Sequence, residues 1–245
     1  MSIHQGEKIS IIGANGTGKS TLLTMLDGLI FPDQGAIKAF GRELNEDFLD
    51  DDEFSRLFRM KVGFVFQNPD VQLFCPSVKE DIIFGPLQMG VPKEEIKRRL
   101  ENVITILAIS DLLERAPHQL SIGEKRKVAI ASVLVIEPRV IILDEPTAGL
   151  DPLTSRQIIE IILKLNLSGC TIVTATHDLH AIPEISDITY VFNKDKRIVR
   201  CDTPYEILSD KKFLEANNLI HIHSHLHNHK IHTHEHLYSS HHPEF

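Results

Sequence analysis

The sequence predicts an α/β fold in which a parallel β-sheet carries helices on its faces. Short apolar runs with the composition of buried strands recur along the chain, and helical patterns lie between them. Buried strands that alternate with helices are typical of a parallel sheet covered on both faces. The strand candidates are Lys8–Ile12, Val62–Phe66, Val140–Leu143 and Thr171–Ala175. The helical patterns cover Ser20–Leu26, Glu94–Leu107, Ser121–Leu134 and Pro152–Leu165.

The first strand is followed at once by the pattern G-x-x-x-x-G-K-[ST] and then by a helix. In this context Gly16 and Gly18 let successive backbone N–H groups face an anion at the positive end of the new helix. Lys19 is expected to reach the β- and γ-phosphates of a nucleotide, and the Ser20 hydroxyl to bind Mg²⁺. The alternative is a glycine-rich turn that happens to carry Lys and Ser, and the complete motif disfavours it. The candidate nucleotide-binding residues are Gly13, Ala14, Asn15, Gly16, Thr17, Gly18, Lys19, Ser20 and Thr21.

Polar side chains follow the three later strand candidates at the point where each strand ends. Gln67 follows the second strand, Asp144 and Glu145 the third, and His177 comes after the fourth. Because the carboxyl ends of parallel strands meet at one edge, these residues should converge on the bound phosphates. Taken singly, Gln67 is more often a turn residue and His177 a surface or core histidine. Two carboxylates beside a phosphate loop instead indicate hydrolysis: Asp144, with Ser20 and Gln67, would hold Mg²⁺. Glu145 would deprotonate the attacking water, with His177 and Gln67 as further catalytic residues.

The composition excludes several classes of protein. The 245 residues include 34 acidic and 26 basic side chains, and this net charge of −8 argues against a nucleic-acid binder that relies on a positive surface. The longest apolar stretches, such as Val128–Ile136, fall well short of the roughly 20 residues that span a bilayer. Three widely spaced cysteines without C-x-x-C pairing fit a reduced, cytosolic protein.

At Leu120-Ser121-Ile122-Gly123-Glu124-Lys125 the chain resembles the signature loop of ATP-binding-cassette (ABC) ATPases, and the resemblance covers roughly residues 3–210. It implies a P-loop NTPase fold with a RecA-like parallel sheet core, a helical signature subdomain at about residues 68–138 and a truncated antiparallel β part. Residues 1–218 would form the ATPase domain, and residues 219–245 a histidine-rich disordered tail. The matching motifs are the Q-loop Gln67, the second nucleotide motif Asp144-Glu145, the D-loop Ala148–Asp151 and the switch histidine His177.

A narrower resemblance concerns Phe66–Phe74, which reads Phe-Gln-Asn-Pro-Asp-Val-Gln-Leu-Phe, and the run from Val78 to Pro86. Both look like the ATPase subunits of energy-coupling-factor importers, particularly those of the cobalt/nickel type. This resemblance implies a homodimer, or a heterodimer with another ABC ATPase, that sandwiches two ATP molecules. Ser121 and Gly123 of one chain would then contact the ATP held by the other. It also implies integral-membrane transport partners and a peripheral place on the cytoplasmic face of the cell membrane.

The sequence departs from the family pattern at two places, and each departure predicts a functional consequence. The signature has Ile122 where Gly is usual and Glu124 where Gln is usual, so we expect weaker ATP-driven closure of the dimer without loss of activity. No Phe, Tyr or Trp precedes Phe31, so the adenine-stacking aromatic that family members carry upstream of the phosphate loop is missing. Losing one stacked base costs about 1–3 kcal/mol. We expect either a natural start upstream of Met1 or a shortened subunit with weak adenine selectivity.

The C-terminal region from His221 to His242 contains ten of the fourteen histidines. Neutral imidazole binds Ni²⁺, Co²⁺, Zn²⁺ and Cu²⁺, so this tail is a candidate transition-metal binder that buffers or senses a transported metal. The alternative is a tag or a solvated tail. The candidate ligands are His221, His223, His225, His227, His229, His232, His234 and His236.

The sequence therefore favours an ATP-hydrolysing importer subunit for nickel or cobalt, with ATP and Mg²⁺ bound. The same ATPase serving a vitamin importer stays open, because ATPase subunits do not contact the substrate. A non-transport ABC ATPase of DNA repair or translation would need a coiled-coil arm or a basic surface, and neither is present in the sequence. A metal-storage module with an inactive cassette is disfavoured by the intact Lys19, Asp144, Glu145 and His177.

Overall fold

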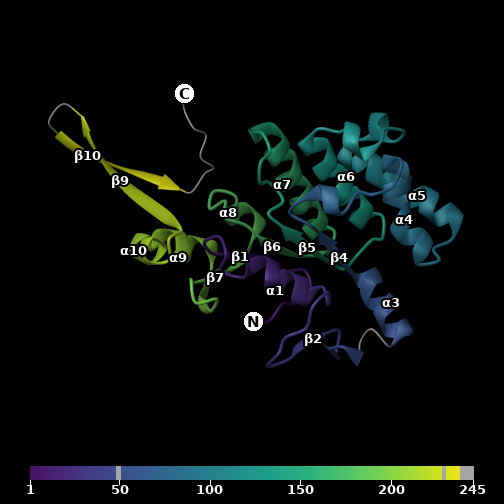
Figure 1. Ribbon diagram of the computed structural model, residues 1–245, viewed down its shortest axis with the longest axis horizontal. Helices are drawn as coiled ribbons and strands as arrows, with labels where there is room; N and C mark the ends of the chain where they lie inside the picture. The colour runs from purple at the N-terminus through teal and green to yellow at the C-terminus, as the bar shows by residue number, and fades with distance from the viewer. Residues whose placement is uncertain (48–50, 228–229, 238–245) are drawn as a thin grey trace.

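The central element is a six-stranded sheet, here described from a computed structural model that covers residues 1–47, 51–227 and 230–237 (Figure 1). Its strand order is β4-β5-β6-β1-β7-β8. The first five strands run parallel and β8 pairs antiparallel with β7. The predicted parallel sheet is therefore confirmed. The strands are β1 (Lys8–Ile12), β4 (Val62–Val65), β5 (Val140–Asp144), β6 (Thr171–Ala175), β7 (Ile188–Phe192) and β8 (Ile198–Asp202).

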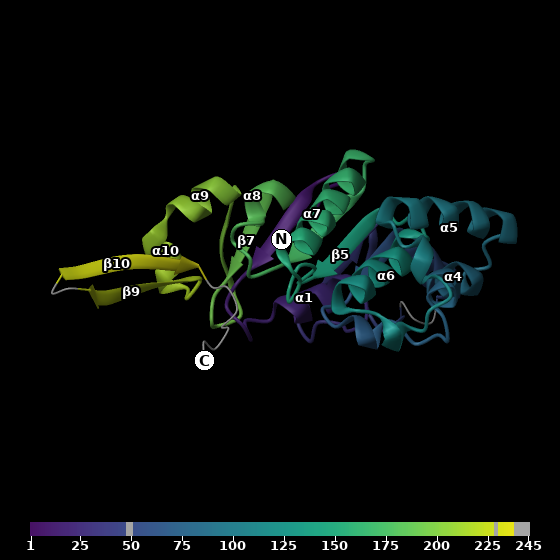
Figure 2. The same ribbon diagram turned by 90° about the horizontal axis from the view of Figure 1, so that it is seen from above.

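Helices cover both faces of this sheet, as Figure 2 shows from above. Because side chains alternate along a strand, Ile141 and Leu143 of β5 pack into one buried cluster and Ile142 into another. The first cluster includes α7 (Pro152–Leu167), and the second includes α1 (Lys19–Leu26) and α3 (Asp52–Lys61). The short helix α8 (Ile182–Ile185) packs beside α7 and β1.

A group of helices between β4 and β5 extends to one side of the sheet (Figures 1 and 2). It contains α4 (Val78–Gln88), α5 (Lys93–Leu107) and α6 (Ile122–Leu134), so the predicted helices 94–107 and 121–134 are confirmed within one residue. The single turn η1 (Pro69–Val71) precedes α4, and the turns η2 (Ser110–Leu112) and η3 (Pro117–Gln119) lie between α5 and α6. The assignment of residues 68–138 as a separate subdomain stays a prediction.

The antiparallel part is small. Besides the β7–β8 pair and the C-terminal hairpin, it consists of β2 (Ile37–Ala39) paired with β3 (Arg42–Leu44). Phe40 at this hairpin packs edge-on against Phe58 of α3, with ring centroids 6.2 Å apart. The hairpin thereby closes the sheet face on which α1 lies.

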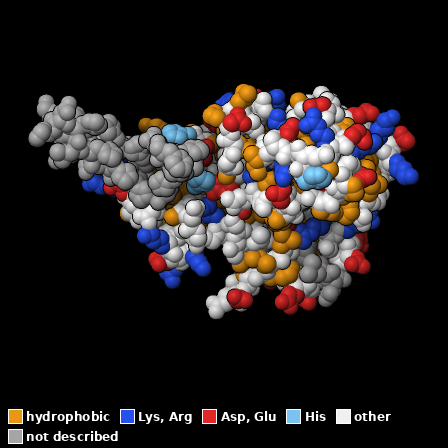
Figure 3. All heavy atoms as spheres, turned by 45° about the horizontal axis from the view of Figure 1, so that its top comes forward, with side chains coloured by type: hydrophobic (Ala, Val, Ile, Leu, Met, Phe, Trp, Pro, Cys, Tyr) orange, Lys and Arg blue, Asp and Glu red, His pale blue; other side chains and the backbone are white. Residues whose placement is uncertain are grey.

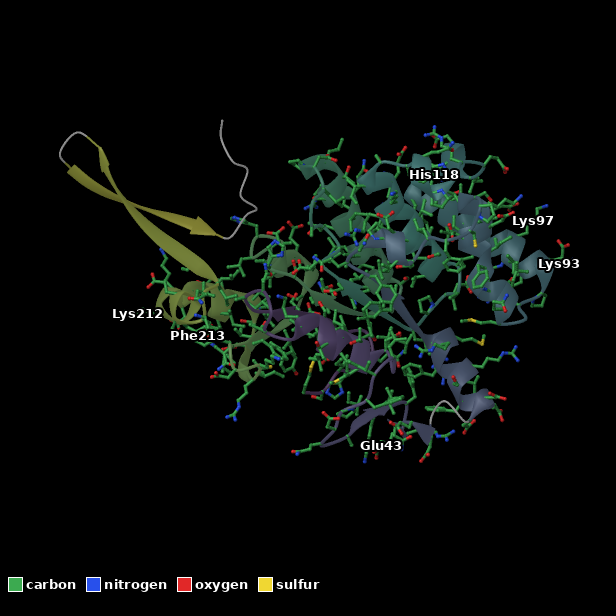
Figure 4. The ribbon with its side chains drawn as sticks, in the orientation of Figure 1. Glu43, Lys93, Lys97, His118, Lys212 and Phe213 are labelled. Carbon is green, nitrogen blue, oxygen red and sulfur yellow. The ribbon has the colours of Figure 1, made fainter. Side chains whose placement is uncertain are left out.

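The C-terminal helices α9 (Pro204–Ser209) and α10 (Lys211–Ala216) pack on the edge of the sheet through Ile207 and Leu214, which join a cluster with Val191. The Arg200 guanidinium carbon lies 5.1 Å from the centroid of the Phe213 ring. Figure 4 shows Lys212 and Phe213 on the opposite side of the molecule from Lys93 and Lys97 of α5.

Beyond α10 the backbone forms an antiparallel hairpin of β9 (Ile220–His227) and β10 (Lys230–Leu237), which projects away from the sheet (Figure 1). The sequence predicted no regular structure here, because histidine-rich composition lacks the apolar residues of a core. The alternation of histidine with Ile, Leu, Ser and Thr nevertheless matches the two-residue period of a strand. The hairpin does not decide where the ATPase domain ends, so the predicted boundary between residues 218 and 219 stays a prediction.

Gly63 of β4 has a packing role that a substitution can test. A Cβ built at Gly63 would lie 2.2 Å from Cγ1 of Val133 on α6, a distance that no real contact adopts. We therefore expect Gly63→Ala to lower the free energy of unfolding by about 1–3 kcal/mol or more through overpacking. Thermal unfolding followed by circular dichroism measures this.

Gly85→Ala on α4 is the matched control, because its Cβ would meet only the flexible end of Ile136 at 3.1 Å. An unfolding temperature for Gly63→Ala equal to that of Gly85→Ala would contradict the close approach of β4 and α6.

Candidate nucleotide site

A glycine loop joins the carboxyl end of β1 to the first turn of α1. Gly16 and Gly18 have φ angles of 81° and 95°, in the left-handed region where a side chain is strained. Gly18 directly precedes α1 and takes the N-cap position without a side-chain cap. The first N–H groups of this helix therefore have no side-chain cap, which is the arrangement that receives an anion.

Lys19 points back into this loop. Its Nζ donates to the carbonyl oxygen of Gly13 at 2.8 Å and lies 3.3 Å from that of Ala14, and the residue is only 6% exposed. Burial lowers the pKa of Lys19, while the nearby charges of Glu145 and Asp144 oppose the shift. The ammonium is thus held at the loop by weak carbonyl acceptors, which phosphate oxygens can replace.

Asp144 ends β5 beside the start of α1. The residue is 5% exposed, and its Oδ1 has no hydrogen-bond partner among the described residues. Burial raises the pKa of Asp144, and a hydrogen bond from the Ser20 side chain opposes the shift. A buried, unpartnered carboxylate oxygen next to a hydroxyl is the all-oxygen donor set that suits Mg²⁺. The described residues at this position therefore fit the predicted ion.

Glu145 follows in a strained backbone conformation, with φ at 48°. Its Oε2 lies 2.8 Å from Nδ1 of His177 and accepts the His177 backbone N–H at 3.3 Å. The hydrogen bond with Glu145 raises the pKa of His177 above its ordinary 6.5, although burial partly opposes it. Because the shift is upward, this pair stabilises the fold most below pH 6.5, and the contribution is lost as pH rises through the folded-state pKa.

Lys19 and Glu145 line a pocket of about 880 Å³, and His177 lines a neighbouring pocket with Gly13, Ala14 and Asn15. Residues 15–22 line the larger pocket along the glycine loop and α1, and Gln67 and Glu145 line its far side. Part of this wall was not predicted from the sequence. Lys196 and Arg197 lie in the turn between β7 and β8, and no sequence motif marks them. The lining residues that were not predicted are Leu22, Met25, Phe192, Lys196, Arg197 and Ile198.

The sequence predicts that this pocket lacks an aromatic side chain that stacks on adenine. Phe192 is the one aromatic among its described lining residues, and it is 7% exposed and packed in the core with Ile11 and Val173. The predicted consequence for adenine selectivity stays a prediction.

Ser121 and Gly123 are not among the described residues that line this pocket. Ser121 caps α6: its Oγ accepts the Glu124 N–H at 3.3 Å, and Glu124 Oε2 accepts the Ser121 N–H at 2.7 Å. The backbone and side chain of Ser121 lower the pKa of Glu124, which is therefore a charged cap. Gly123 lies against Thr154, since its Cβ would come within 3.1 Å of Thr154 Cγ2. The predicted effect of Glu124 on dimer closure remains untested.

Residues 1–148 match the ABC transporter family. Among curated relatives, the nickel import ATP-binding protein NikO of Rhodobacter capsulatus is 43% identical over 90% of this chain and 87% of its own length. The energy-coupling factor transporter ATP-binding protein EcfA of Methanocaldococcus jannaschii is 41% identical over 89% of this chain and 76% of its own length.

Two solved structures are similar along most of the chain. CbiO1 of Clostridium perfringens, part of the ABC transporter complex CbiONQ, superposes with a TM-score of 0.75 at 38% identity, covering 89% of this chain and 86% of its own. The cassette MJ0796 was solved as a dimer in a post-hydrolysis state with ADP and phosphate. It superposes with a TM-score of 0.74 at 30% identity, and the match covers 83% of this chain and 88% of its own. The fold is therefore that of the P-loop NTPases.

The contact between Glu145 and His177 yields a direct test by titration. Glu145→Gln removes the carboxylate that raises the pKa of His177, so we expect that pKa to fall. Side-chain NMR of His177 as a function of pH measures the shift. Glu160→Gln, which changes an exposed carboxylate paired with Arg156, is the control. A His177 titration that Glu145→Gln leaves unchanged would show that the two groups do not interact in solution.

Proposed function

The chain belongs to the ABC transporter family, and from that premise we propose that it is the ATPase of an energy-coupling-factor importer that takes up nickel or cobalt ions. The observation that carries this proposal is the convergence of Lys19, Asp144, Glu145 and His177 at one edge of the sheet. Similarity to a nickel import protein and to an energy-coupling factor ATPase supports the type of importer.

We assign the following roles at the nucleotide. The loop from Gly13 to Thr21 binds the phosphates of ATP through its backbone N–H groups, and Lys19 neutralises the β- and γ-phosphates. Ser20, Asp144 and Gln67 would hold Mg²⁺, which supplies charge neutralisation at the phosphates when bound. Glu145 accepts the proton of the attacking water, and His177 orients the Glu145 carboxylate through their hydrogen bond.

Because Ser121 and Gly123 lie outside the Lys19 pocket, we propose that they complete the pocket of a second ATPase, either another copy or a related subunit. The start of α6 then presents its first N–H groups to the γ-phosphate bound by the other subunit. The dimeric state of MJ0796 supports this arrangement. Two ATP molecules would close the dimer, and hydrolysis would open it.

The membrane partner would dock on the helices between β4 and β5. Figure 3 shows hydrophobic side chains reaching the surface between charged ones in this part of the molecule. Phe74 and Phe84 are 66% and 41% exposed, and their rings meet edge-on at 5.0 Å. Val71 and Leu87 are also exposed. Exposed aromatic patches of this kind mark protein interfaces. Among the described residues, no helix is long and apolar enough to cross a bilayer itself. The proposed location is therefore peripheral, on the cytoplasmic face of the membrane.

The proposed metal substrate rests on the histidine tail. The backbone register places His225 opposite His232, His223 opposite His234 and His221 opposite His236. Residues two apart on a strand share a face, so these positions all fall on one face of the hairpin. Opposed imidazoles at such spacing can share a divalent transition-metal ion. His229 lies outside the described residues, and no side chain of the tail is described. Among the described side chains, no group of three or more His, Cys, Asp or Glu residues could hold a metal ion.

The test of the ATPase proposal is Glu145→Gln. We expect ATP turnover to fall by about 10²–10⁴-fold, since a general base is lost, while bound ATP is retained. Phosphate release and nucleotide retention after gel filtration, measured with the membrane partners present, provide the two readouts. Glu160→Gln should turn over ATP normally. Persistent turnover in Glu145→Gln would mean that another group is the base.

The metal proposal is tested with a chain that ends at Ile220. It should lose Ni²⁺ and Co²⁺ binding by calorimetry, and binding to the full chain should weaken below about pH 6 as imidazoles protonate. Lys19→Ala in the full chain should keep metal binding and lose ATP binding. Equal Ni²⁺ affinity with and without residues 221–245 would refute a metal-binding tail. Uptake of labelled nickel, cobalt and a set of vitamins by the assembled importer then decides the substrate.

A further inference from the structure

The loop that follows β4 is held by a buried side chain from α6. Arg126 is 2% exposed and lies five residues after Ser121. Its Nη1 donates to the carbonyl oxygen of Phe66 at 2.8 Å, and its Nη2 donates to that of Gln67 at 2.6 Å. A single planar guanidinium thus fixes two consecutive peptide groups at the nucleotide pocket.

A second side chain makes the same connection from the opposite direction. Gln72 Oε1 accepts the Phe66 N–H at 3.2 Å, while its Nε2 donates to the carbonyl oxygen of Ala129 at 2.8 Å and to Ser132 Oγ at 3.0 Å. Lys125 adds an ion pair to Asp70 at 2.6 Å. The backbone from Phe66 to Gln72 is therefore joined to α6 along most of that helix.

The charge of Arg126 also matters for the site. Burial lowers the pKa of Arg126, and the charges of Asp144 and Glu145 oppose the shift, so the guanidinium lies within the field of the two carboxylates. Its Nε is buried without a hydrogen-bond partner among the described residues. Burying an incompletely paired charge is unfavourable. A purely apolar contact would join α6 to the loop without that cost.

We propose that Arg126 is a positioning residue that makes Gln67 and the signature loop move as one unit. When Gln67 shifts toward bound nucleotide, the bonds of Arg126 displace the start of α6 with it. Ser121 and Gly123 are thereby oriented for the ATP of the second subunit. This proposal rests on the proposed function, because it assigns a coupling role within the same nucleotide site.

The test compares Arg126 with Arg99. Arg99 also donates to a backbone carbonyl, that of Ile136 at 3.0 Å, but it ties α5 to the distal end of α6. Arg126→Lys keeps the charge but can donate to only one of the two carbonyl oxygens. Arg126→Met removes both the charge and the hydrogen bonds. We expect Arg126→Met to lower kcat by about 10²-fold. Arg126→Lys should be intermediate, and the Kd for ATP should change little because Arg126 does not line the pocket. Arg99→Lys and Arg99→Met should retain kcat.

Two further readouts separate positioning from stability. The Mg²⁺ concentration for half-maximal activity should rise in the Arg126 variants, because Gln67 is misplaced. Hydrogen exchange measures how ATP protects the backbone amides of the two segments. In the unaltered chain, ATP should slow exchange in both residues 66–72 and residues 121–127. In Arg126→Lys, it should slow exchange in residues 66–72 only. Equal kcat losses at Arg99 and Arg126, or joint protection that survives in Arg126→Lys, would overturn the proposal. If ATP binds but the unaltered protein does not hydrolyse it, the proposed function fails, and the exchange result still decides the coupling.

Discussion

The structure depends on one electrostatic constraint, the burial of the Lys19 ammonium in the field of Asp144 and Glu145. Buried charges are tolerated only when other groups compensate them. Here the compensation comes from carbonyl oxygens of the glycine loop and from carboxylates that end β5. That arrangement requires β1 and β5 to run parallel and to end at the same edge, which the order β4-β5-β6-β1-β7-β8 provides. The apolar strands therefore do more than form a core, because their register sets the distances between charged groups.

The same constraint explains why the site is open on one side. In the proposed ATPase, Lys19, Asp144 and Glu145 serve the phosphates of ATP and the accompanying Mg²⁺, whereas Ser121 at the capped start of α6 is not among the described residues that line their pocket. In the proposed dimer, a second subunit fills that side. The fold then acts as two half sites, with the helices between β4 and β5 carrying one half and the sheet edge the other. Arg126 and Gln72 join the loop after β4 to α6, and the exposed rings of Phe74 and Phe84 follow that loop in the chain.

The site was more predictable from sequence than the surrounding structure. The glycine loop and the Asp144-Glu145 pair are each contiguous in the sequence, so each motif could be recognised without knowledge of the fold. Strands β1 and β6 match their predicted limits, because short segments rich in β-branched residues are typical of buried strands. The strands β7 and β8 and the helix α3 were not predicted. β8 is mostly exposed and α3 is rich in charge, so both lack the apolar signal of a buried element. β7 is buried and apolar, and its signal was overlooked. Arg126 and Gln72 were missed because they bond mainly to backbone atoms far away in the sequence, and no sequence pattern records such contacts. Phe66 lies 60 residues from Arg126, and Ala129 lies 57 residues from Gln72. In the C-terminal region the backbone pairs β9 with β10, and the predicted disorder of this tail stays a prediction.

The central claim is that each ATP site is built from Lys19 of one subunit and Ser121 of the other, and mixed dimers test it most directly. Lys19→Ala and Ser121→Arg each damage every site of their own homodimer, so both should be inactive alone. A mixed dimer of the two variants contains one site with both residues intact. ATP hydrolysis should therefore reappear when the two inactive proteins are mixed with the membrane partners. A mixture that stays inactive, although the mixed dimer forms, would contradict the account.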